Sequence, residues 1–239
     1  MRLVQPASGP RTTTDPIFLA DFIVRSCGLR PCRACDLGAG TGVLGLLLAT
    51  LDPRVAVVGI ELQPELARLA AHNAAQNGLA SRVRCECADL RALGAKPARA
   101  PFDLVLSNPP YHEAASGRVS SDRTRALAHH ELGCSLGDVL ATASRLLTPR
   151  GALALIYPAP RLQDLVTALL AERFRLRFLR MLHPRAGRPA ARVLVLAQRS
   201  RKARLSVLPP LFLHEGTGWA AEAAAILDGA TADSRAARR

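Results

Sequence analysis

Short apolar segments alternate with longer segments of helical periodicity from Ala34 to Arg173, and this alternation restricts the fold more than any other feature of the chain. The apolar segments have the length of buried strands, and the segments between them are long enough for crossover helices. Strands separated in this way form a parallel sheet. The predicted strands are Arg33–Leu37, Val55–Glu61, Arg82–Ala88, Phe102–Ser107 and Ala152–Tyr157, and the predicted helices are Gly42–Leu51, Pro64–Asn77, Leu136–Leu147 and Arg161–Arg173.

The pattern changes after Arg173. Residues Phe174–Phe178 alternate with period two, a turn rich in proline and glycine follows at Pro184–Pro189, and Val193–Ala197 is apolar again. Two strands joined by such a turn predict a hairpin. Thr148–Gly151 predicts a further turn, just before the fifth strand. The sequence therefore predicts an α/β fold whose parallel sheet ends in an antiparallel hairpin.

Composition indicates one large globular domain. The chain has 239 residues, of which 49% are apolar and 21% charged, and this excludes disordered and collagen-like classes. No window approaches the roughly 18–20 apolar residues of a spanning helix, and Met1–Pro6 lacks the apolar core of a signal peptide. We expect a cytoplasmic protein with a single domain over residues 1–239, flexible at residues 1–12 and 230–239.

A glycine-rich loop, Asp36-Leu37-Gly38-Ala39-Gly40-Thr41-Gly42, follows the first predicted strand and leads directly into a helix. Glycines allow close backbone approach to a ligand, and a helix start offers unpaired N–H groups. A dinucleotide site has the spacing Gly-x-Gly-x-x-Gly, which differs from the spacing here. Asp36 would repel a pyrophosphate but attract an ammonium group, which favours S-adenosylmethionine (SAM) over NAD.

Acidic residues stand at the ends of three consecutive predicted strands: Asp36, Glu61 and Asp89. A carboxylate at the position of Glu61 can accept hydrogen bonds from both hydroxyls of a ribose. Asp89 can accept one from an exocyclic adenine amine. Because the carboxyl ends of parallel strands share one edge of the sheet, the three acids and the glycine loop predict a nucleoside site there.

The turn Asn108-Pro109-Pro110-Tyr111 ends the fourth predicted strand and is the most specific signal in the chain. Two prolines stiffen the turn and remove two N–H donors, so the Asn108 amide oxygen and the Pro109 carbonyl become fixed acceptors. Acceptors that hold the hydrogens of an exocyclic amine favour the pyramidal geometry that frees its lone pair. Tyr111 offers a surface on which a base can stack. These residues therefore predict methyl transfer to an amine.

Taken together, Asp36–Gly42, Glu61, Asp89 and Asn108–Tyr111 resemble the motifs of class I methyltransferases, whose fold is a Rossmann-like, seven-stranded and mostly parallel sheet. The chain is most similar to the bacterial family that methylates N6 of an adenine in the anticodon loop of valine tRNA. The similarity covers roughly residues 12 to 228, including Thr13–Asp15 before a first helix and Leu213–Trp219 before a last one.

The resemblance implies a role for each matching residue. Gly38, Gly40 and Gly42 would line the methionine part of SAM, Glu61 would hold the ribose, and Asp89 the adenine. The turn Asn108–Tyr111 would hold the target amine, and its Asn108 would border the cofactor as well. Thr13–Asp15 would lie near the cofactor.

Other acceptors and classes remain open. Release-factor glutamine methyltransferases use the same Asn-Pro-Pro-Tyr turn for a side-chain amide, and other RNA or DNA base amines are further candidates. Two further hypotheses come from other functional classes. Asp36 and the glycine spacing argue against the first, an NAD-dependent oxidoreductase. An RNA-binding module without catalysis has no need of both Asn108 and the glycine loop.

The net charge of +13 favours an acidic partner such as nucleic acid. A bias of the genome towards arginine codons would produce the same excess of basic residues. Between Arg173 and Arg204 there are eleven basic residues and no acid. In a regular strand Arg173, Arg175 and Arg177 would share one face, opposite Phe174, Leu176 and Phe178, and we expect the arginines to contact RNA phosphates. The alternative is an edge strand protected by charge. Arg118, Arg123 and Arg125 fall in the segment His112–His130, which predicts a substrate loop.

Six cysteines are too few for a disulfide scaffold and fit a reducing compartment. Their spacings, including Cys32-x-x-Cys35, lack a second pair at the distance of a zinc site, so we predict buried thiols and no metal. His129-His130-Glu131 has no third ligand at a useful spacing and predicts a helix start.

Overall fold

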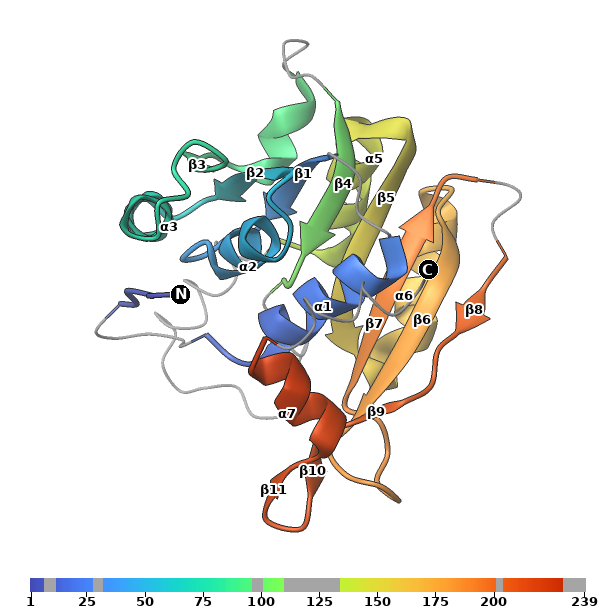
Figure 1. Ribbon diagram of the computed structural model, residues 1–239. Coiled ribbons are helices and arrows are strands. Elements are labelled where there is room, and N and C mark those ends of the chain that lie inside the picture. The colour runs from blue at the N-terminus through green and yellow to red at the C-terminus, as the bar shows by residue number, and fades with distance from the viewer. Residues whose placement is uncertain (7–11, 28–31, 96–100, 110–133, 201–203, 230–239) are drawn as a thin grey trace, which may run out of the picture.

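The computed structural model describes residues 1–6, 12–27, 32–95, 101–109, 134–200 and 204–229 (Figure 1). Helices and strands alternate along most of this length. The first elements are α1 (Asp15–Cys27), β1 (Cys32–Leu37), α2 (Val43–Leu51), β2 (Val55–Glu61), α3 (Pro64–Gln76), β3 (Val83–Cys87) and β4 (Phe102–Ser107). The later elements are α5 (Leu136–Leu146), β5 (Leu147–Pro158), α6 (Leu162–Ala171), β6 (Arg175–His183), β7 (Arg192–Gln198), β8 (Ser206–Val207), β9 (Leu211–Phe212), β10 (His214–Glu215), β11 (Gly218–Trp219) and α7 (Ala221–Leu227).

The central sheet has the strand order β3-β2-β1-β4-β5-β7-β6 (Figure 1). Strands β1 to β5 pair in parallel, whereas β7 lies antiparallel between β5 and β6. This arrangement confirms the predicted, mostly parallel sheet with an antiparallel hairpin at its C-terminal end. Its seven long strands are the predicted number, and the two-residue strands β8 and β9, which the sequence did not indicate, pair with β6.

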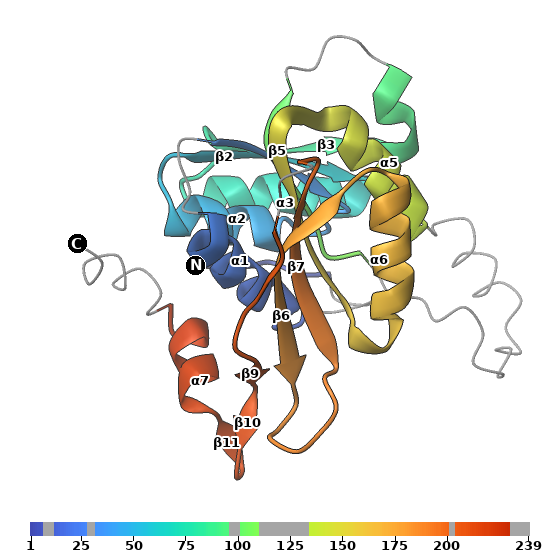
Figure 2. The same ribbon diagram turned by 90° about the vertical axis from the view of Figure 1, so that its right-hand side faces the viewer.

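Helices cover both faces of the sheet (Figure 2). On one face, α1, α2 and α7 share one hydrophobic cluster with side chains such as Ala154 and Ile156 of β5. On the other face, α5 and α6 pack against Leu153 and Leu155 of the same strand. A strand buried on both faces is apolar throughout, which explains why the strands appear in the sequence as continuous apolar runs. Among the helices described, none is long and apolar enough to cross a bilayer.

The turn predicted at Thr148–Gly151 is instead part of β5. Leu147 pairs with Phe102 of β4, and the next pair is Ala152 with Leu104, so the residues between Leu147 and Ala152 form a bulge. A Cβ atom on Gly151 would lie 2.7 Å from a Leu147 methyl carbon. The glycine therefore marks a close approach within a bulged strand, where the sequence pattern suggested a connection.

A second bulge corrects the predicted faces of β6. Leu176 pairs with Ala197 and Phe178 pairs with Leu196, which leaves Arg177 as the inserted residue. As a result Leu176 packs in the cluster on the α6 side, whereas Phe178 packs in the cluster on the α1 side. Strict alternation placed both residues on one face, and it fails because the extra residue shifts the period by one.

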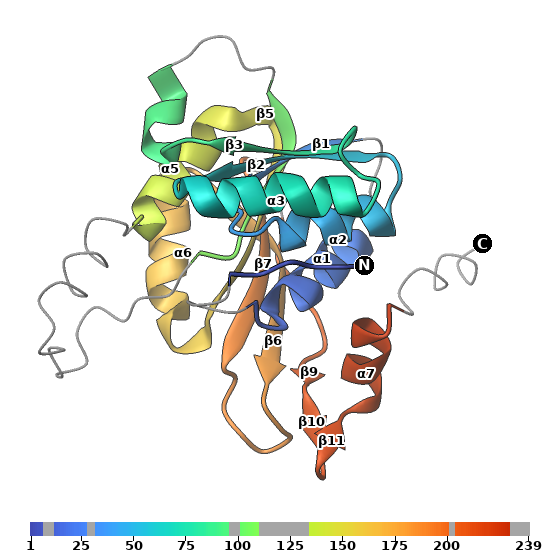
Figure 3. The same ribbon diagram turned by 90° about the vertical axis from the view of Figure 1, so that its left-hand side faces the viewer.

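The N-terminal segment lies beside α3 (Figure 3). The Asn73 side chain accepts a hydrogen bond from Val4 N at 2.8 Å and donates one to Val4 O at 3.0 Å. Asn77 makes the same pair of bonds with the backbone of Arg2, at 2.8 and 2.6 Å. Two asparagines one helical turn apart therefore hold the backbone of residues 2 and 4 against α3, while the flexibility expected for residues 1–12 stays a prediction.

Candidate functional site

A cavity of about 440 Å³ lies at the carboxyl ends of β1 and β4, the edge at which parallel α/β sheets bind ligands. Its walls come from the N-terminal segment, the start of α1, the loop after β1 and the turn after β4. The lining residues are Gln5, Pro6, Thr12, Thr13, Asp15, Pro16, Asp36, Gly38, Ala39, Gly40, Thr41, Val43, Leu44, Gln63, Glu65, Leu66, Asn108, Pro109 and Arg192.

The three loop glycines have different roles. All have positive φ angles, 77° at Gly38, 55° at Gly40 and 82° at Gly42, which glycine adopts without steric cost. Gly38 and Gly40 line the cavity, and no atom lies within 4 Å of a Cβ placed on either. Gly42 is the N-cap of α2 and is not among the lining residues; its Cβ would lie 3.1 Å from that of Ala70. Two glycines open the floor of the cavity, and the third permits helix packing.

Glu61 supports the loop from behind. One carboxylate oxygen accepts a hydrogen bond from Gly40 N at 2.8 Å, and the other accepts one from Gln63 N at 2.9 Å. The side chain is buried and is not among the residues that line the cavity. Glu61 therefore holds Gly40 and Gln63, which both line the cavity.

Asp36 is buried at the end of β1 and lines the cavity. Burial and the nearby Glu61 carboxylate raise the pKa of Asp36 to about 7. The carboxyl group is therefore poised to ionise near neutral pH, and a cationic ligand would favour its charged form. Such a perturbed acid inside a cleft is typical of a binding or catalytic site.

The raised pKa of Asp36 predicts a pH dependence of stability. Because the folded-state pKa lies above the unfolded value of 3.8, the stabilisation from Asp36 is full below pH 3.8 and is lost as the pH rises to about 7. Urea denaturation should show the advantage of the wild type over Asp36→Asn falling by roughly 4 kcal/mol across this window. Parallel stability curves for the two proteins would contradict the assignment.

The turn after β4 is tied to the loop after β1. The buried Ser107 hydroxyl donates a hydrogen bond of 2.6 Å to the carbonyl of Leu37. This bond joins the two strand ends, so half-buried Asn108 and buried Pro109 face the same cavity as Gly38. The fold therefore brings together Asp36, the open glycines and the start of the Asn-Pro-Pro-Tyr turn, as the sequence predicted. Pro110 and Tyr111 lie outside the described residues.

Asp89 is not part of this cavity in the structure. Its carboxylate pairs with the guanidinium of Arg91 at 2.6 Å, and this hydrogen-bonded partner lowers the pKa of Asp89. Asp89 follows β3, two strands away from β1, and is not among the residues that line the cavity. The sequence grouped three acids by their strand-end positions, but only Asp36 lines the cavity.

Several cavity residues had no signal of their own in the sequence. Gln5 and Pro6 come from the N-terminal segment, which carries no motif. Arg192, from the start of β7, bonds the carboxylate of Asp15 at 3.1 Å across 177 positions of sequence. Thr13 and Asp15, which the resemblance placed near a cofactor, do line the cavity. Gln5, Pro6 and Arg192 could be found only from their long-range contacts.

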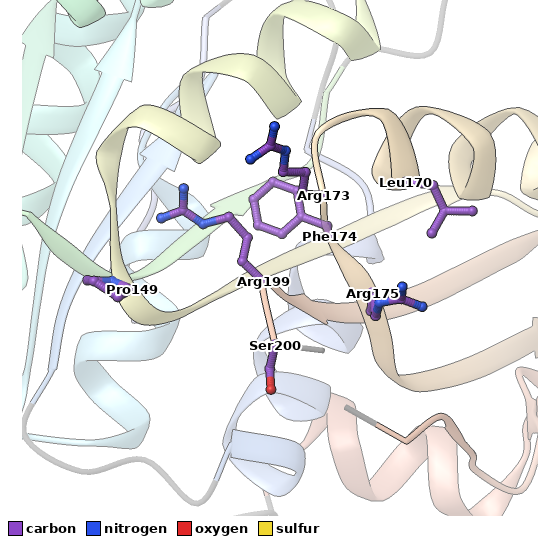
Figure 4. Close-up of a pocket in the computed structure, with 7 residues that line it drawn as sticks. All are labelled: Pro149, Leu170, Arg173, Phe174, Arg175, Arg199 and Ser200. Carbon is purple, nitrogen blue, oxygen red and sulfur yellow. The ribbon is translucent and has the colours of Figure 1, made fainter. Parts of the chain in front are cut away.

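Two of the arginines predicted to contact RNA lie at a different cavity, of about 780 Å³ (Figure 4). Arg173 and Arg175 line it between the end of α6 and the start of β6, together with Arg199 from the end of β7. Pro149, near the amino end of β5, forms another wall, so this cavity is at the sheet edge opposite Asn108. Arg177 does not line it.

Arg173 has a backbone conformation that favours glycine. Its φ angle is 61°, and it follows α6, where its N–H donates to Leu170 O at 3.0 Å. The next N–H, of Phe174, donates to Leu169 O at 2.8 Å, which completes a Schellman motif. An arginine here costs roughly 1–2 kcal/mol of backbone strain relative to glycine.

Part of the acid-free basic run has a structural role. Arg180 is buried and bonds Glu222 of α7 at 2.7 Å. Arg192 pairs with Asp15, and Arg199 donates to the backbone carbonyl of Leu147, just before the β5 bulge, at 3.1 Å. These three members of the run, which were not among the arginines predicted to contact RNA, are thus engaged in tertiary contacts. Arg118, Arg123, Arg125 and His129–Glu131 lie outside the described residues.

The described cysteines do not form one class. Cys35 is buried as predicted, but Cys87 is exposed. Burial raises the pKa of Cys32 to about 11, and that of Cys85 to about 12, so these thiols stay protonated at neutral pH. Within the described ranges, no group of three or more histidine, cysteine or acidic side chains is arranged to hold a metal ion.

Comparison with known proteins matches the middle of the chain to an established family. Residues 30–181 fit the sequence profile of a family described as a methyltransferase domain. A tRNA1(Val) (adenine(37)-N6)-methyltransferase from Porphyromonas gingivalis is 36% identical over 164 residues, which cover 67% of this chain and 64% of the relative. One from Aeromonas hydrophila is 36% identical over 135 residues, 56% of this chain and 55% of the relative. The match thus spans somewhat less than two thirds of these curated relatives.

Solved structures show the same fold. A predicted O-methyltransferase, Atu636 from Agrobacterium tumefaciens, has a TM-score of 0.68 and 26% identity, and the alignment covers 90% of this chain and 96% of that one. TrmN from Thermus thermophilus has a TM-score of 0.55 and 24% identity, with 77% of this chain and 49% of that one aligned. The sheet, the glycine loop and the cavity therefore occur within a methyltransferase architecture.

Proposed function

This chain belongs to the methyltransferase-domain family, and from that premise we propose that it transfers a methyl group from SAM to the exocyclic N6 amine of an adenine in tRNA. The observation that carries the proposal is the placement of Asn108 and Pro109 in one cavity with Asp36 and the open glycines. The membership confirms the methyltransferase resemblance noted in the sequence. The adenine acceptor and the tRNA substrate are proposed from the two curated relatives, which are both named tRNA1(Val) (adenine(37)-N6)-methyltransferases.

The cavity fits SAM in size and chemistry. Its volume of about 440 Å³ is in the range of small-molecule sites, roughly 300–1,000 Å³. Asp36 would hold the ammonium group of the methionine part, and the open backbone at Gly38 and Gly40 would lie against it. Glu61 holds Gly40 in place, and each of its oxygens retains a second lone pair for a ribose hydroxyl. When bound, SAM supplies a methyl group already activated as a sulfonium.

The turn after β4 would bind and orient the acceptor amine. The Asn108 amide oxygen and the Pro109 carbonyl accept its two hydrogens, which draws the lone pair out of conjugation with the ring. Because the donor is already activated, the protein mainly aligns nitrogen, carbon and sulfur and excludes water. No strong base is needed, since the methylated amine is cationic and its proton leaves to solvent or to the turn.

Transfer of a labelled methyl group tests the reaction and the acceptor together. The purified protein is incubated with labelled SAM and, separately, total tRNA, ribosomal RNA, DNA or release factor, and labelled nucleosides are analysed by mass. We expect N6-methyladenosine in the tRNA fraction. Label in release factor would move the assignment to glutamine methylation, and label in none of them would contradict the proposed reaction.

We further propose that Arg173 and Arg175 contact RNA phosphates at the cavity opposite the methylation edge. Both are exposed, and in the described part of the chain neither makes an ion pair. An arginine at a position that favours glycine points to a role other than stability. Base contacts need the edge with Asn108, whereas phosphate contacts can lie far from the target base.

Salt dependence tests this contact. The double variant Arg173→Gly, Arg175→Gln should weaken tRNA binding and reduce the slope of log K against log salt by about 1–2, since each lost phosphate contact contributes about 0.7–0.9. Arg173→Gly alone should raise thermal stability by relieving strain. The control is Arg84→Gln. Arg84 is an exposed arginine on β3, the edge strand at the opposite end of the strand order from β6. If the salt dependence of tRNA binding is unchanged in the double variant, these arginines do not contact phosphates, and the alternative of an edge strand protected by charge is favoured.

A further inference from the structure

Two exposed aromatic side chains lie near the C-terminal end of the described chain. Trp219 is 42% exposed and Phe212 is 38% exposed, whereas the other large hydrophobic residues found exposed in the described part are aliphatic. Exposed aromatic rings cost free energy in water unless something covers them. Neither residue takes part in the cavity described above.

The segment that carries both rings is bonded to the turn between β6 and β7. The turn between β6 and β7 accepts hydrogen bonds from Leu213 N, through the carbonyl of His183 at 2.9 Å, and from His214 N, through the carbonyl of Pro184 at 3.0 Å. These bonds join that turn to the β10–β11 hairpin, and the two project side by side at the bottom of Figures 1 and 2. The aromatic residues therefore do not sit on an independent loop.

Each ring is already in contact with a histidine. The rings of His214 and Trp219 stack with centroids 4.4 Å apart and an interplanar angle of 29°. The rings of His183 and Phe212 lie 5.5 Å apart and are tilted by 53°. Because the Trp219 ring stacks on His214 and is still 42% exposed, a further flat ring can stack on its exposed part.

This pair of hairpins lies at the edge of the sheet that carries the methylation turn. Strands β5 and β6 run in the same direction, because both are antiparallel to β7, so the β6–β7 turn follows the carboxyl end of β6. Trp219 also lies 6.4 Å from Phe18 of α1, ring to ring, and the first turn of α1 supplies Asp15 and Pro16 to the cavity. The aromatic surface is thus next to the cavity rim.

Basic groups accompany the rings. Arg185 and Arg188 are exposed in the β6–β7 turn, and the backbone carbonyl of Arg188 accepts a hydrogen bond of 2.7 Å from His183 Nδ1. The β10–β11 hairpin itself carries one acidic residue, Glu215, against the two arginines of the neighbouring turn. Aromatic faces interleaved with arginines match single-stranded nucleic acid, whose bases stack while its phosphates are neutralised.

We propose that Trp219, stacked on His214, and Phe212 hold unpaired bases that neighbour the target adenine in an RNA loop, with Arg185 and Arg188 on the adjoining phosphates. This inference rests on the proposed function and specifies its substrate as a single-stranded loop. A base must leave its stack to reach Asn108, and a surface that stacks its neighbours offsets part of that cost. A second copy of the chain is the competing occupant.

Trp219 is the one tryptophan of the 239-residue chain, so its fluorescence reports directly on this surface. With S-adenosylhomocysteine present to prevent turnover, a short RNA hairpin with an unpaired adenine in its loop should quench the emission saturably. A fully paired RNA of the same composition should quench it much less. Quenching that depends on protein concentration without RNA would assign the surface to self-association and overturn the proposal.

Variants are compared by the anisotropy of labelled RNA. Trp219→Phe keeps an aromatic face and should bind the hairpin RNA within about threefold of wild type, whereas Trp219→Leu should bind it about tenfold or more weakly, because it removes the ring on which a base stacks. Binding of the paired RNA should change little. Val207→Ala removes an exposed aliphatic residue on β8 and is the control. Equal hairpin affinity for the leucine and phenylalanine variants would overturn the proposal.

Methyl transfer separates this inference from the proposed function. If the stacking surface positions the RNA, Trp219→Leu raises KM for the hairpin RNA while kcat changes little. If the wild type binds the hairpin but methylates no RNA, the proposed reaction fails while the binding surface stands. If Trp219→Leu transfers methyl groups with an unchanged KM for the hairpin RNA, the proposed stacking on Trp219 is wrong, while the proposed reaction stands.

Discussion

Replacing Asn108 with alanine should lower the rate of methyl transfer by roughly two to three orders of magnitude, the loss found when one preorganised polar group that stabilises a transition state is removed. Asn108 follows Ser107, whose hydroxyl joins the end of β4 to Leu37 at 2.6 Å, so the backbone that carries the amide is fixed before the acceptor arrives. The alanine variant keeps Pro109 and the glycine loop. Its affinity for SAM should therefore stay within a few-fold of wild type.

Single-turnover transfer to tRNA and calorimetric SAM binding measure the two effects separately. Asn108→Asp is the matched variant, because it keeps an acceptor oxygen at the same position and should lose less activity than alanine. Unchanged thermal stability of both variants would exclude a folding defect. Wild-type activity in Asn108→Ala would remove this residue from the reaction.

Replacing Asn73 with alanine should lower the free energy of unfolding by about 2–4 kcal/mol and weaken SAM binding by about tenfold. The Asn73 amide is buried and donates to the carbonyls of Val4 and Thr41, both at 3.0 Å. Thr41 belongs to the glycine loop, and Val4 precedes Gln5, so one side chain connects two walls of the cavity. Its removal leaves the buried carbonyl of Thr41 without this donor and releases the backbone of Val4, so neither wall is held to the other.

Asn77→Ala is the matched control, since it removes the corresponding bonds to Arg2 at the far end of the same segment. We expect it to cost less than about 1 kcal/mol, because Arg2 is exposed and water replaces the lost bonds. Denaturant unfolding and calorimetry on the two variants give the comparison. Equal losses of SAM affinity in both would show that Asn73 has no special link to the cavity.

The order of the elements was predictable from the sequence because it depends on local patterns. The strand Val55–Glu61 was predicted with both ends correct, and α3 was predicted to within one residue of its observed end at Gln76. The turn at Thr148–Gly151 was wrong, since the residues that favour turns also permit a bulge when a neighbouring strand supplies hydrogen bonds. The two-residue strands β8 to β11 are too short to produce a period of their own.

The candidate site was predicted in part. Asp36, Gly38, Gly40 and Asn108 were identified by motif, and the structure brings them to one cavity. Asn73 carried no signal, because it resembles any polar residue of a helix and its partner Val4 is 69 positions away. A contact between segments so far apart is formed only by the packing of α3 against the rest of the protein.

By itself, the sequence determined that the fold is α/β, that a glycine loop and an Asn-Pro-Pro-Tyr turn end two of its strands, and that both belong to one edge of the sheet. These features depend on the burial period and backbone preferences of neighbouring residues. Only the tertiary structure decided that Asp89 pairs with Arg91 outside the cavity, that Phe178 faces α1 and that Trp219 lies beside the start of α1. The physical reason is that a side chain's surroundings depend on strand register, bulges and long-range pairing, which bring together residues that no local pattern connects.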